Sequence, residues 1–332
     1  IVAAQRFRHQ FEETKNSMWQ LCNRYQCPCS FLLLTLLLIG SFGLVGCGGQ
    51  KTEKKEISPA AQLAAAKTIT DPAERSQAFT EVSLRYLKAA DNGGARSALL
   101  LATQSADEIK KRDAVKRATS YIVLAKAWYQ VQGNNDDECK DAYRDAEKSI
   151  PRIDNPIEKT ETLLNLAELK NDIDKKSSAK KHLDAGTKGV EAIEDPVERV
   201  RLLGKLARFY VKIGKDQEAK TTIQSAIKLA EEEKDDGKKA TLLIQIAGEQ
   251  MGSLKDSPSG MATLIEAQTL VGTLKGNPNR QANLMIDIAQ VYNNTGQKSK
   301  ARELLDSAEK ICRGRSECKP AMKRIEKVRD KM

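Results

Sequence analysis

The chain has 332 residues, of which 40% are hydrophobic, 5% aromatic and 30% charged, and its formal net charge is +10 at pH 7. Only two residues are His, so a catalytic centre that depends on histidine has almost no candidates. Acidic and basic residues are interspersed, and no basic stripe carries interleaved aromatic residues. This composition predicts long amphipathic helices and no nucleic-acid partner.

The amino-terminal part is an apolar segment without charge. Residues 31–46 read FLLLTLLLIGSFGLVG and are followed by Cys47-Gly48-Gly49. The segment 44–47, LVGC, resembles the lipobox of bacterial lipoproteins, in which a signal peptidase cuts before the cysteine and the thiol receives diacylglycerol. The resemblance implies a leader over residues 1–46, a lipidated Cys47 and a membrane-anchored protein on the periplasmic or extracytoplasmic face, at the outer membrane in a Gram-negative cell.

Two other interpretations of this segment stay open. An uncleaved membrane anchor needs about 20 apolar residues, and the uncharged stretch is long enough. A buried helix is the other. The first residue is not Met, and Met18 is a candidate start. Residues 47–57, which include a run of charged residues, are expected to form a flexible tether.

A repeat with a period of about 41 residues fills the rest of the chain. Each unit is opened by an Asp or Asn that is usually followed by Pro, a pattern typical of a helix N-cap followed by proline at the first helical position. The openers are Asp71, Asp113, Asn155, Asp195, Asp236 and Asn277, at spacings of 42, 42, 40, 41 and 41. Such regularity predicts an array of equivalent units. It also predicts a half-unit, a helix after Ser58-Pro59, before the first opener.

Apolar and small residues recur at fixed offsets from each opener, on one stripe of a first helix. Eight and eleven positions on they are apolar, and twelve positions on they are small: Phe79, Val82, Ser83; Tyr121, Leu124, Ala125; Leu163, Leu166, Ala167; Leu203, Leu206, Ala207; Ile244, Ala247, Gly248; Met285, Ile288, Ala289. A second helix follows in every unit. It is marked by a large residue three positions before a small one: Leu99, Ala102; Tyr143, Ala146; Leu183, Gly186; Ile223, Ala226; Leu264, Ala267; Leu305, Ala308.

These columns resemble the tetratricopeptide repeat (TPR) family, and the unit from Leu203 to Ala226 matches best. The resemblance implies an all-α fold, a right-handed α-solenoid of about six helix hairpins over residues 58–318. Two features depart from the family. The period exceeds the usual length of about 34 residues, which predicts longer second helices, and Lys170 stands where the third unit should have an aromatic residue.

In this family the first helices line a concave face that binds partners. Carried over by position, the polar residues of that face are Lys126, Glu161, Glu168, Arg201, Arg208, Lys212, Glu249, Gln290, Asn293 and Asn294. Glu161 and Arg201 share a column in neighbouring units, and so do Glu168 and Arg208. Either these pairs form a ladder of salt bridges between repeats, or they form a charged groove that recognises a peptide.

The last residues differ from the repeats. Cys312 and Cys318 flank a turn, and an exported protein could join them in a disulfide; two independent thiols are the alternative. Residues 319–332 are predicted to form a basic helix that caps the array, with an apolar stripe of Ala321, Met322, Ile325 and Val328. Its Lys and Arg side chains could also contact lipid headgroups. Cys139, in the second unit, is expected to be buried.

No catalytic motif stands in a suitable context. His182, the one histidine outside the leader, is interpreted as a surface residue. We therefore expect no enzyme, no cofactor and no metal. The expected function is protein–protein interaction or scaffolding in the bacterial cell envelope, with a protein or peptide partner. The alternative is an envelope carbohydrate- or lipid-binding assembly factor.

Overall fold

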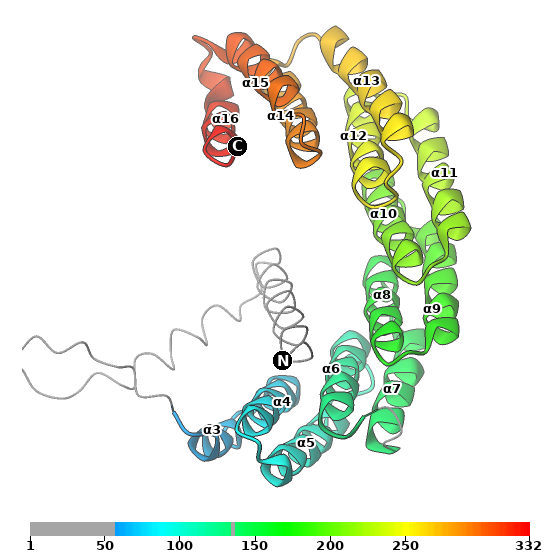
Figure 1. Ribbon diagram of the computed structural model, residues 1–332, viewed down its shortest axis with the longest axis vertical. Coiled ribbons are helices and arrows are strands. Elements are labelled where there is room, and N and C mark those ends of the chain that lie inside the picture. Colours follow the sequence, from blue (N-terminus) through cyan, green and yellow to red (C-terminus); the bar gives the residue numbers. More distant parts are fainter. Residues whose placement is uncertain (1–56, 134–136) are drawn as a thin grey trace, which may run out of the picture. The chain divides into compact units, whose positions relative to one another are not determined.

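The computed structural model describes residues 57–133 and 137–332. The predicted leader, with Met18 and Cys47, lies outside these ranges. All regular elements of the described part are helices (Figure 1). They are α3 (Pro59–Ala66), α4 (Pro72–Lys88), α5 (Asn92–Asp107), α6 (Ala114–Gln132), α7 (Asp137–Ser149), α8 (Pro156–Asp172), α9 (Lys176–Gly189), α10 (Pro196–Lys212), α11 (Asp216–Glu232), α12 (Asp236–Gly252), α13 (Ser257–Thr273), α14 (Pro278–Asn294), α15 (Lys298–Cys312) and α16 (Lys319–Arg329), with 3₁₀ turns η1 (Ile150–Arg152), η2 (Val190–Ala192) and η3 (Ser316–Cys318).

Six hairpins, from α4/α5 to α14/α15, make up the predicted repeats within the described ranges. Each first helix also contacts the next first helix, α4 with α6 and so on to α14. In Figure 1 the first helices therefore lie along the inner side of the repeat domain and the second helices along the outer side. The prediction of an all-α, TPR-like solenoid is confirmed. None of the described helices has the length and apolar character of a membrane span.

The openers act as helix caps because their side chains accept hydrogen bonds from the otherwise unpaired first N–H groups. Asp71 accepts from the backbone N–H of Ala73 and of Glu74, and Asn155 accepts from two such groups at α8. Asp195 accepts from one, that of Val197, at α10. Proline follows each of these three residues at the first helical position. Asp113 precedes α6 without a side-chain cap bond.

In the fifth unit the predicted register is wrong by one residue. The N-cap of α12 is Asp235, whose carboxylate accepts from the N–H of Lys238 and pairs with Arg280, while Asp236 is already helical. Two consecutive Asp residues can both serve as caps, so the sequence pattern does not separate them. With Asp235 as the opener, Ala247 moves into the small-residue column, and Gln250 takes the position, 15 residues after the opener, that Lys170 has in the third unit.

The predicted lengthening of the second helices is also wrong. First helices have 17 or 19 residues, whereas second helices have 13 to 17. The extra residues of each repeat instead extend the first helices and the links between hairpins, such as η1 and η2 with the short segments after them.

The small-residue columns lie at the closest helix contacts. Every predicted pair of the second helices is buried, and so are Ala125, Ala167, Ala207 and Ala289 of the first helices. Cys139 is buried as predicted, and its Sγ contacts the carbonyl oxygen of Ala125 at 3.4 Å. Because small side chains let two helix axes approach, these columns fix the spacing within each hairpin.

Both ends of the array are covered by the predicted single helices. At the start, α3 is capped by Ser58 and packs on α4. At the end, α16 packs on α14 and α15 in the position that the first helix of a further repeat would take. Its Ala321, Ile325 and Val328 are buried. Both helices shield apolar surface that the terminal hairpins would otherwise expose.

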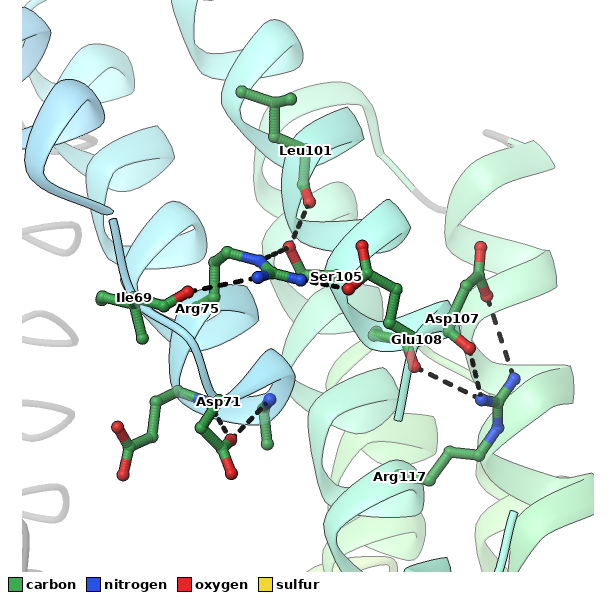
Figure 2. A network of polar contacts seen from close by, with 11 residues as sticks. Ile69, Asp71, Arg75, Leu101, Ser105, Asp107, Glu108 and Arg117 are labelled. Carbon is green, nitrogen blue, oxygen red and sulfur yellow. Dashed lines mark hydrogen bonds and ion pairs between the residues drawn. The ribbon is translucent and has the colours of Figure 1, made fainter. Parts of the chain in front are cut away.

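Arg75 of α4 ties three segments together (Figure 2). Its Nη1 donates to the Ile69 carbonyl oxygen at 3.2 Å, and its Nε donates to Ser105 Oγ at 3.0 Å. The remaining amino group pairs with Glu108 at the end of α5. One guanidinium thus links the segment after α3 with α4 and α5.

The same position, four residues after the opener, closes the preceding helix in other units. Arg117 lies beside Asp107, where α5 ends (Figure 2), and its Nη1 donates to the carbonyl oxygen of Asp107 at 3.0 Å. The same nitrogen donates to the carbonyl oxygen of Ile109, two residues further on, at 2.7 Å. Gln281 donates to the Val271 carbonyl oxygen of α13 at 2.9 Å. These bonds satisfy carbonyl groups that a helix end leaves without a partner.

Gly260 of α13 tests the close helix contact. A Cβ there would lie 2.2 Å from Met251 Cγ and 3.1 Å from the Ala247 carbonyl oxygen of α12. We expect Gly260→Ala to lower the unfolding free energy by about 1–3 kcal/mol through overpacking, although alanine is favoured in helices by about 1 kcal/mol. Urea unfolding measures the change.

The control is Gly272→Ala in the same helix, where a Cβ would meet no atom within 4 Å. This variant should unfold at the same or a higher urea concentration. Equal effects of the two substitutions would contradict the role of Gly260.

Candidate functional site

The predicted groove residues all lie on first helices and therefore on the inner side of the repeat domain (Figure 1). Lys126 is on α6, Glu161 and Glu168 are on α8, Arg201, Arg208 and Lys212 are on α10, Glu249 is on α12, and Gln290, Asn293 and Asn294 are on α14.

The predicted contact between Glu161 and Arg201 is confirmed. Arg201 Nη1 lies 3.0 Å from Glu161 Oε1, and Lys205 Nζ lies 3.1 Å from the same oxygen. Arg201 also pairs with Glu198 of its own helix at 2.6 Å. Side chains at this contact are 24–31% exposed, so water screens it only in part.

The predicted contact between Glu168 and Arg208 is wrong. Glu168 pairs with Lys212, one helical turn further along α10, at 3.0 Å, and Arg208 pairs with Glu249 of α12. Neighbouring first helices are staggered along their axes, so residues in one column are not always the nearest pair. Lys205 and Lys212 each lie 44 residues after their glutamate.

The salt bridges between neighbouring first helices form a ladder that balances the charge on the inner side of α10. Its four inner cations, Arg201, Lys205, Arg208 and Lys212, face four carboxylates, and Lys126 is likewise matched by Asp172 at 3.3 Å. Exposed ion pairs of this kind contribute about 0.2–1 kcal/mol each. This stretch of the inner face therefore couples neighbouring repeats and has little free charge for a ligand.

The fifth unit interrupts the ladder with two glycines. Gly248 and Gly252 of α12 occupy the columns of Arg208 and Lys212, 13 and 17 positions after their N-caps. A Cβ on Gly252 would meet no atom within 4 Å. The inner side of α12 is therefore bare helix backbone at these positions. The sequence analysis missed these glycines because it took Asp236 as the opener. Counted from Asp236, Glu249 and not Gly248 stands in the column of Arg208.

The sixth unit presents amide side chains in the same two columns. Gln290 is half-buried and Asn294 is exposed, and neither has a side-chain hydrogen bond to any other residue that the structure describes. On the same two helices, α12 and α14, the side-chain oxygens Gln245 Oε1 and Asn293 Oδ1 are buried. Neither accepts a hydrogen bond from any residue that the structure describes. Buried polar atoms are normally paired, so this part of the inner face retains unused hydrogen-bonding capacity.

Lys170, the departure in the third unit, lies in a buried polar cluster. Its side chain is 3% exposed, and Nζ lies 2.9 Å from Glu147 Oε1 and 3.1 Å from the centre of the Tyr143 ring. His182 Nε2 lies 3.3 Å from the same oxygen, and its side chain is 18% exposed, so the histidine predicted at the surface is partly buried and has a specific partner. A lysine can occupy this buried position because two residues of α7 stabilise its ammonium group: Glu147 through an ion pair and Tyr143 through its aromatic ring.

The cluster shifts the titration of Glu147. The hydrogen bond from His182 lowers the pKa of this carboxyl to about 2, with a further contribution from Lys170, although partial burial acts in the opposite direction. Burial lowers the pKa of the Lys170 ammonium, against the hydrogen bond to Glu147. The contact joins α7, α8 and α9.

Cys312 and Cys318 are both buried free thiols in this structure. Burial and the hydrogen bond that the Cys312 thiol donates to Cys318 raise the pKa of the Cys312 thiol to about 12, which keeps it protonated at neutral pH. Their pairing in a disulfide after export stays a prediction.

A family model for the tetratricopeptide repeat matches residues 200–233. This chain is a TPR-like helical repeat protein. The match falls on α10 and α11, the hairpin whose residues resemble the TPR pattern best. Within residues 57–133 and 137–332 no group of three or more His, Cys, Asp or Glu side chains is placed to hold a metal ion.

No curated protein sequence matches this TPR-like chain. Ton1535 from Thermococcus onnurineus NA1 is 13% identical over 80% of this chain and 94% of its own, with a TM-score of 0.37. BtubC (BKLC) from P. vanneervenii is 15% identical over 77% and 91%, with a TM-score of 0.34, and pilF from Pseudomonas aeruginosa is 15% identical over 79% and 99%, with a TM-score of 0.32. These values are too low to carry an argument about function.

The Glu147 cluster predicts a pH dependence of stability. The pKa of Glu147 is about 2 in the folded protein and about 4.3 in an unfolded chain. Because the pKa is lower in the folded state, ionised Glu147 stabilises the fold when the pH is above the unfolded-state pKa. This stabilisation is lost as the pH falls from about 4.3 to about 2. We expect Glu147→Gln to unfold at a lower urea concentration than the wild type at pH 7, and the difference to shrink across that window.

The control is Glu303→Gln on the exposed side of α15, which should follow the wild type at every pH. A difference between Glu147→Gln and the wild type that stays constant from neutral to acid pH would contradict the assignment.

Proposed function

We propose that this chain is a membrane-anchored bacterial lipoprotein whose TPR-like array binds a protein or peptide partner in the cell envelope. TPR-like repeats generally mediate protein–protein interaction. The observation that carries the proposal is the change along the inner face. In the columns 13 and 17 positions after the N-cap, α10 carries the paired cations Arg208 and Lys212, whereas α12 carries glycines and α14 carries unengaged amides.

The α12 and α14 stretch suits an extended peptide. Amide side chains both donate and accept hydrogen bonds, as a peptide main chain does. Gln290 and Asn294 offer such groups, and Gly248 and Gly252 leave room beside them. Close approach of a ligand backbone is one of the uses of glycine. We define this stretch, Gly248, Gly252, Gln290 and Asn294, as the amide face.

Site-specific photocrosslinking tests the amide face in intact cells. A photoreactive residue replaces Gln290 in one variant and Gln224, an exposed glutamine on the outer helix α11, in the other. We expect a distinct protein to be crosslinked from position 290 and not from position 224. Adding Gly252→Lys, which gives α12 the side chain that α10 has in this column, should reduce that crosslink several-fold without affecting the fold.

The same protein crosslinked equally from both positions, or an unchanged yield with Gly252→Lys, would contradict binding at the amide face. Crosslinks to glycan or lipid and to no protein would favour the alternative of an envelope carbohydrate- or lipid-binding factor.

The membrane anchor is proposed from residues 44–47, LVGC, which lie outside the described residues. If Cys47 carries the acyl chains, Cys47→Ser should abolish incorporation of a labelled fatty acid, because serine has no thiol to carry diacylglycerol. The measurements are fatty-acid labelling and the mass of the isolated protein.

The matched control is Cys139→Ser, a buried cysteine of the repeat domain, which should be labelled and processed like the wild type. Membrane association without labelling in the wild type would instead favour an uncleaved apolar anchor.

A further inference from the structure

The positive charge of the chain is concentrated at its carboxyl end. Residues 313–332 contain eight Lys or Arg and three Asp or Glu, which leaves a net charge of +5 out of +10 for the whole chain. These residues form the turn after α15, then η3 and α16.

Two of the eight cations are held within the array. Arg324 pairs with Asp287 of α14 at 2.7 Å, and Arg329 pairs with Asp306 and Glu309 of α15 at 2.6 and 2.8 Å. These two contacts attach α16 to the last hairpin. They are the counterpart of the ladder on α10.

The other cations remain unmatched. Arg313 is 77% exposed and lies 4.0 Å from Glu309, which Arg329 already engages. The others are exposed and form no ion pair with any residue in the described ranges: Arg315, Lys319, Lys323, Lys327 and Lys331. By contrast, the four inner cations of α10 each have a carboxylate partner.

Four of these cations line one concavity of about 750 Å³. Arg313, Arg315, Lys319 and Lys323 surround it together with Met322, and the carboxylates of Glu309 and Glu326 also line it. We name Arg313, Arg315, Lys319, Lys323 and Lys327 the basic end surface. Its excess of cations over carboxylates fits a ligand with several negative charges.

We propose that the basic end surface docks on anionic phospholipid headgroups. The apolar stripe of α16 is buried against α14 and α15, so this helix presents cations outward and has no apolar face to insert. Such a surface attracts anionic lipids through charge alone, within about a Debye length of the membrane.

The proposal rests on the proposed anchor in one respect. Electrostatic contact by a few lysines is weak for a free protein, but tethering to the same membrane raises the effective concentration of the headgroups. An anchored array would therefore need only a modest affinity at its carboxyl end.

Lysine footprinting of the full chain tests the proposal. The chain is mixed with vesicles of phosphatidylcholine, or of phosphatidylcholine and phosphatidylglycerol, and an amine-reactive reagent labels accessible lysines. We expect labelling of Lys319, Lys323 and Lys327 to fall several-fold on the anionic vesicles and to recover in high salt. Lys228 and Lys275, exposed on α11 and after α13, should be labelled equally on both.

A charge-reversed variant gives the matched comparison. Arg315→Glu, Lys319→Glu and Lys323→Glu together should abolish the protection of Lys327, whereas Lys111→Glu, Lys228→Glu and Lys275→Glu, with the same change of charge, should leave it intact. Circular dichroism checks that both variants keep their helix content.

The outcomes separate this proposal from the anchor. Equal labelling of the basic end surface on both vesicles, with the chain sedimenting with both, overturns headgroup docking and leaves the anchor standing. A chain that stays in solution with phosphatidylcholine but is protected on anionic vesicles supports docking and contradicts the anchor. Protection by soluble polyphosphate and not by anionic vesicles overturns docking in favour of a soluble anion.

Discussion

Close packing of two helices within each hairpin is the constraint on which this structure depends. Small residues stand where the helices touch, and at Gly260 the neighbouring backbone lies so near that even a methyl group would collide with Met251. Short helices are marginal alone and gain stability from tertiary packing. The hairpin is therefore the unit of packing, and stacking of hairpins buries a continuous core.

Polar contacts then determine how the hairpins stack. Arg75 and Arg117 bind carbonyl groups where helices end, and the ladder from Glu161 to Lys212 joins neighbouring first helices. Once these contacts are satisfied, two surfaces are left with unused capacity. The amide face lacks hydrogen-bond partners and the basic end surface lacks carboxylates, which is why both proposals concern these places.

Sequence periodicity predicted the parts of the fold that depend on a residue's own helix. The caps at Asp71 and Asn155 and the buried small-residue columns follow from local hydrogen bonding and from 3.6-residue periodicity. The same reasoning failed at Asp236, because Asp235 and Asp236 are equally suitable caps on local grounds. The contact of Asp235 with Arg280, 45 residues away, is absent from any local pattern.

The sequence by itself determined the number of hairpins and, in every unit but the fifth, where the first helix begins and which stripe it buries. Tertiary structure alone decided the partners of Glu168 and Arg208 and the surroundings of Lys170 and His182. Those contacts depend on how far one helix is staggered against the next. That stagger moves Glu168 from Arg208 to Lys212, and it arises from side-chain packing between hairpins, which a column of residue types does not record.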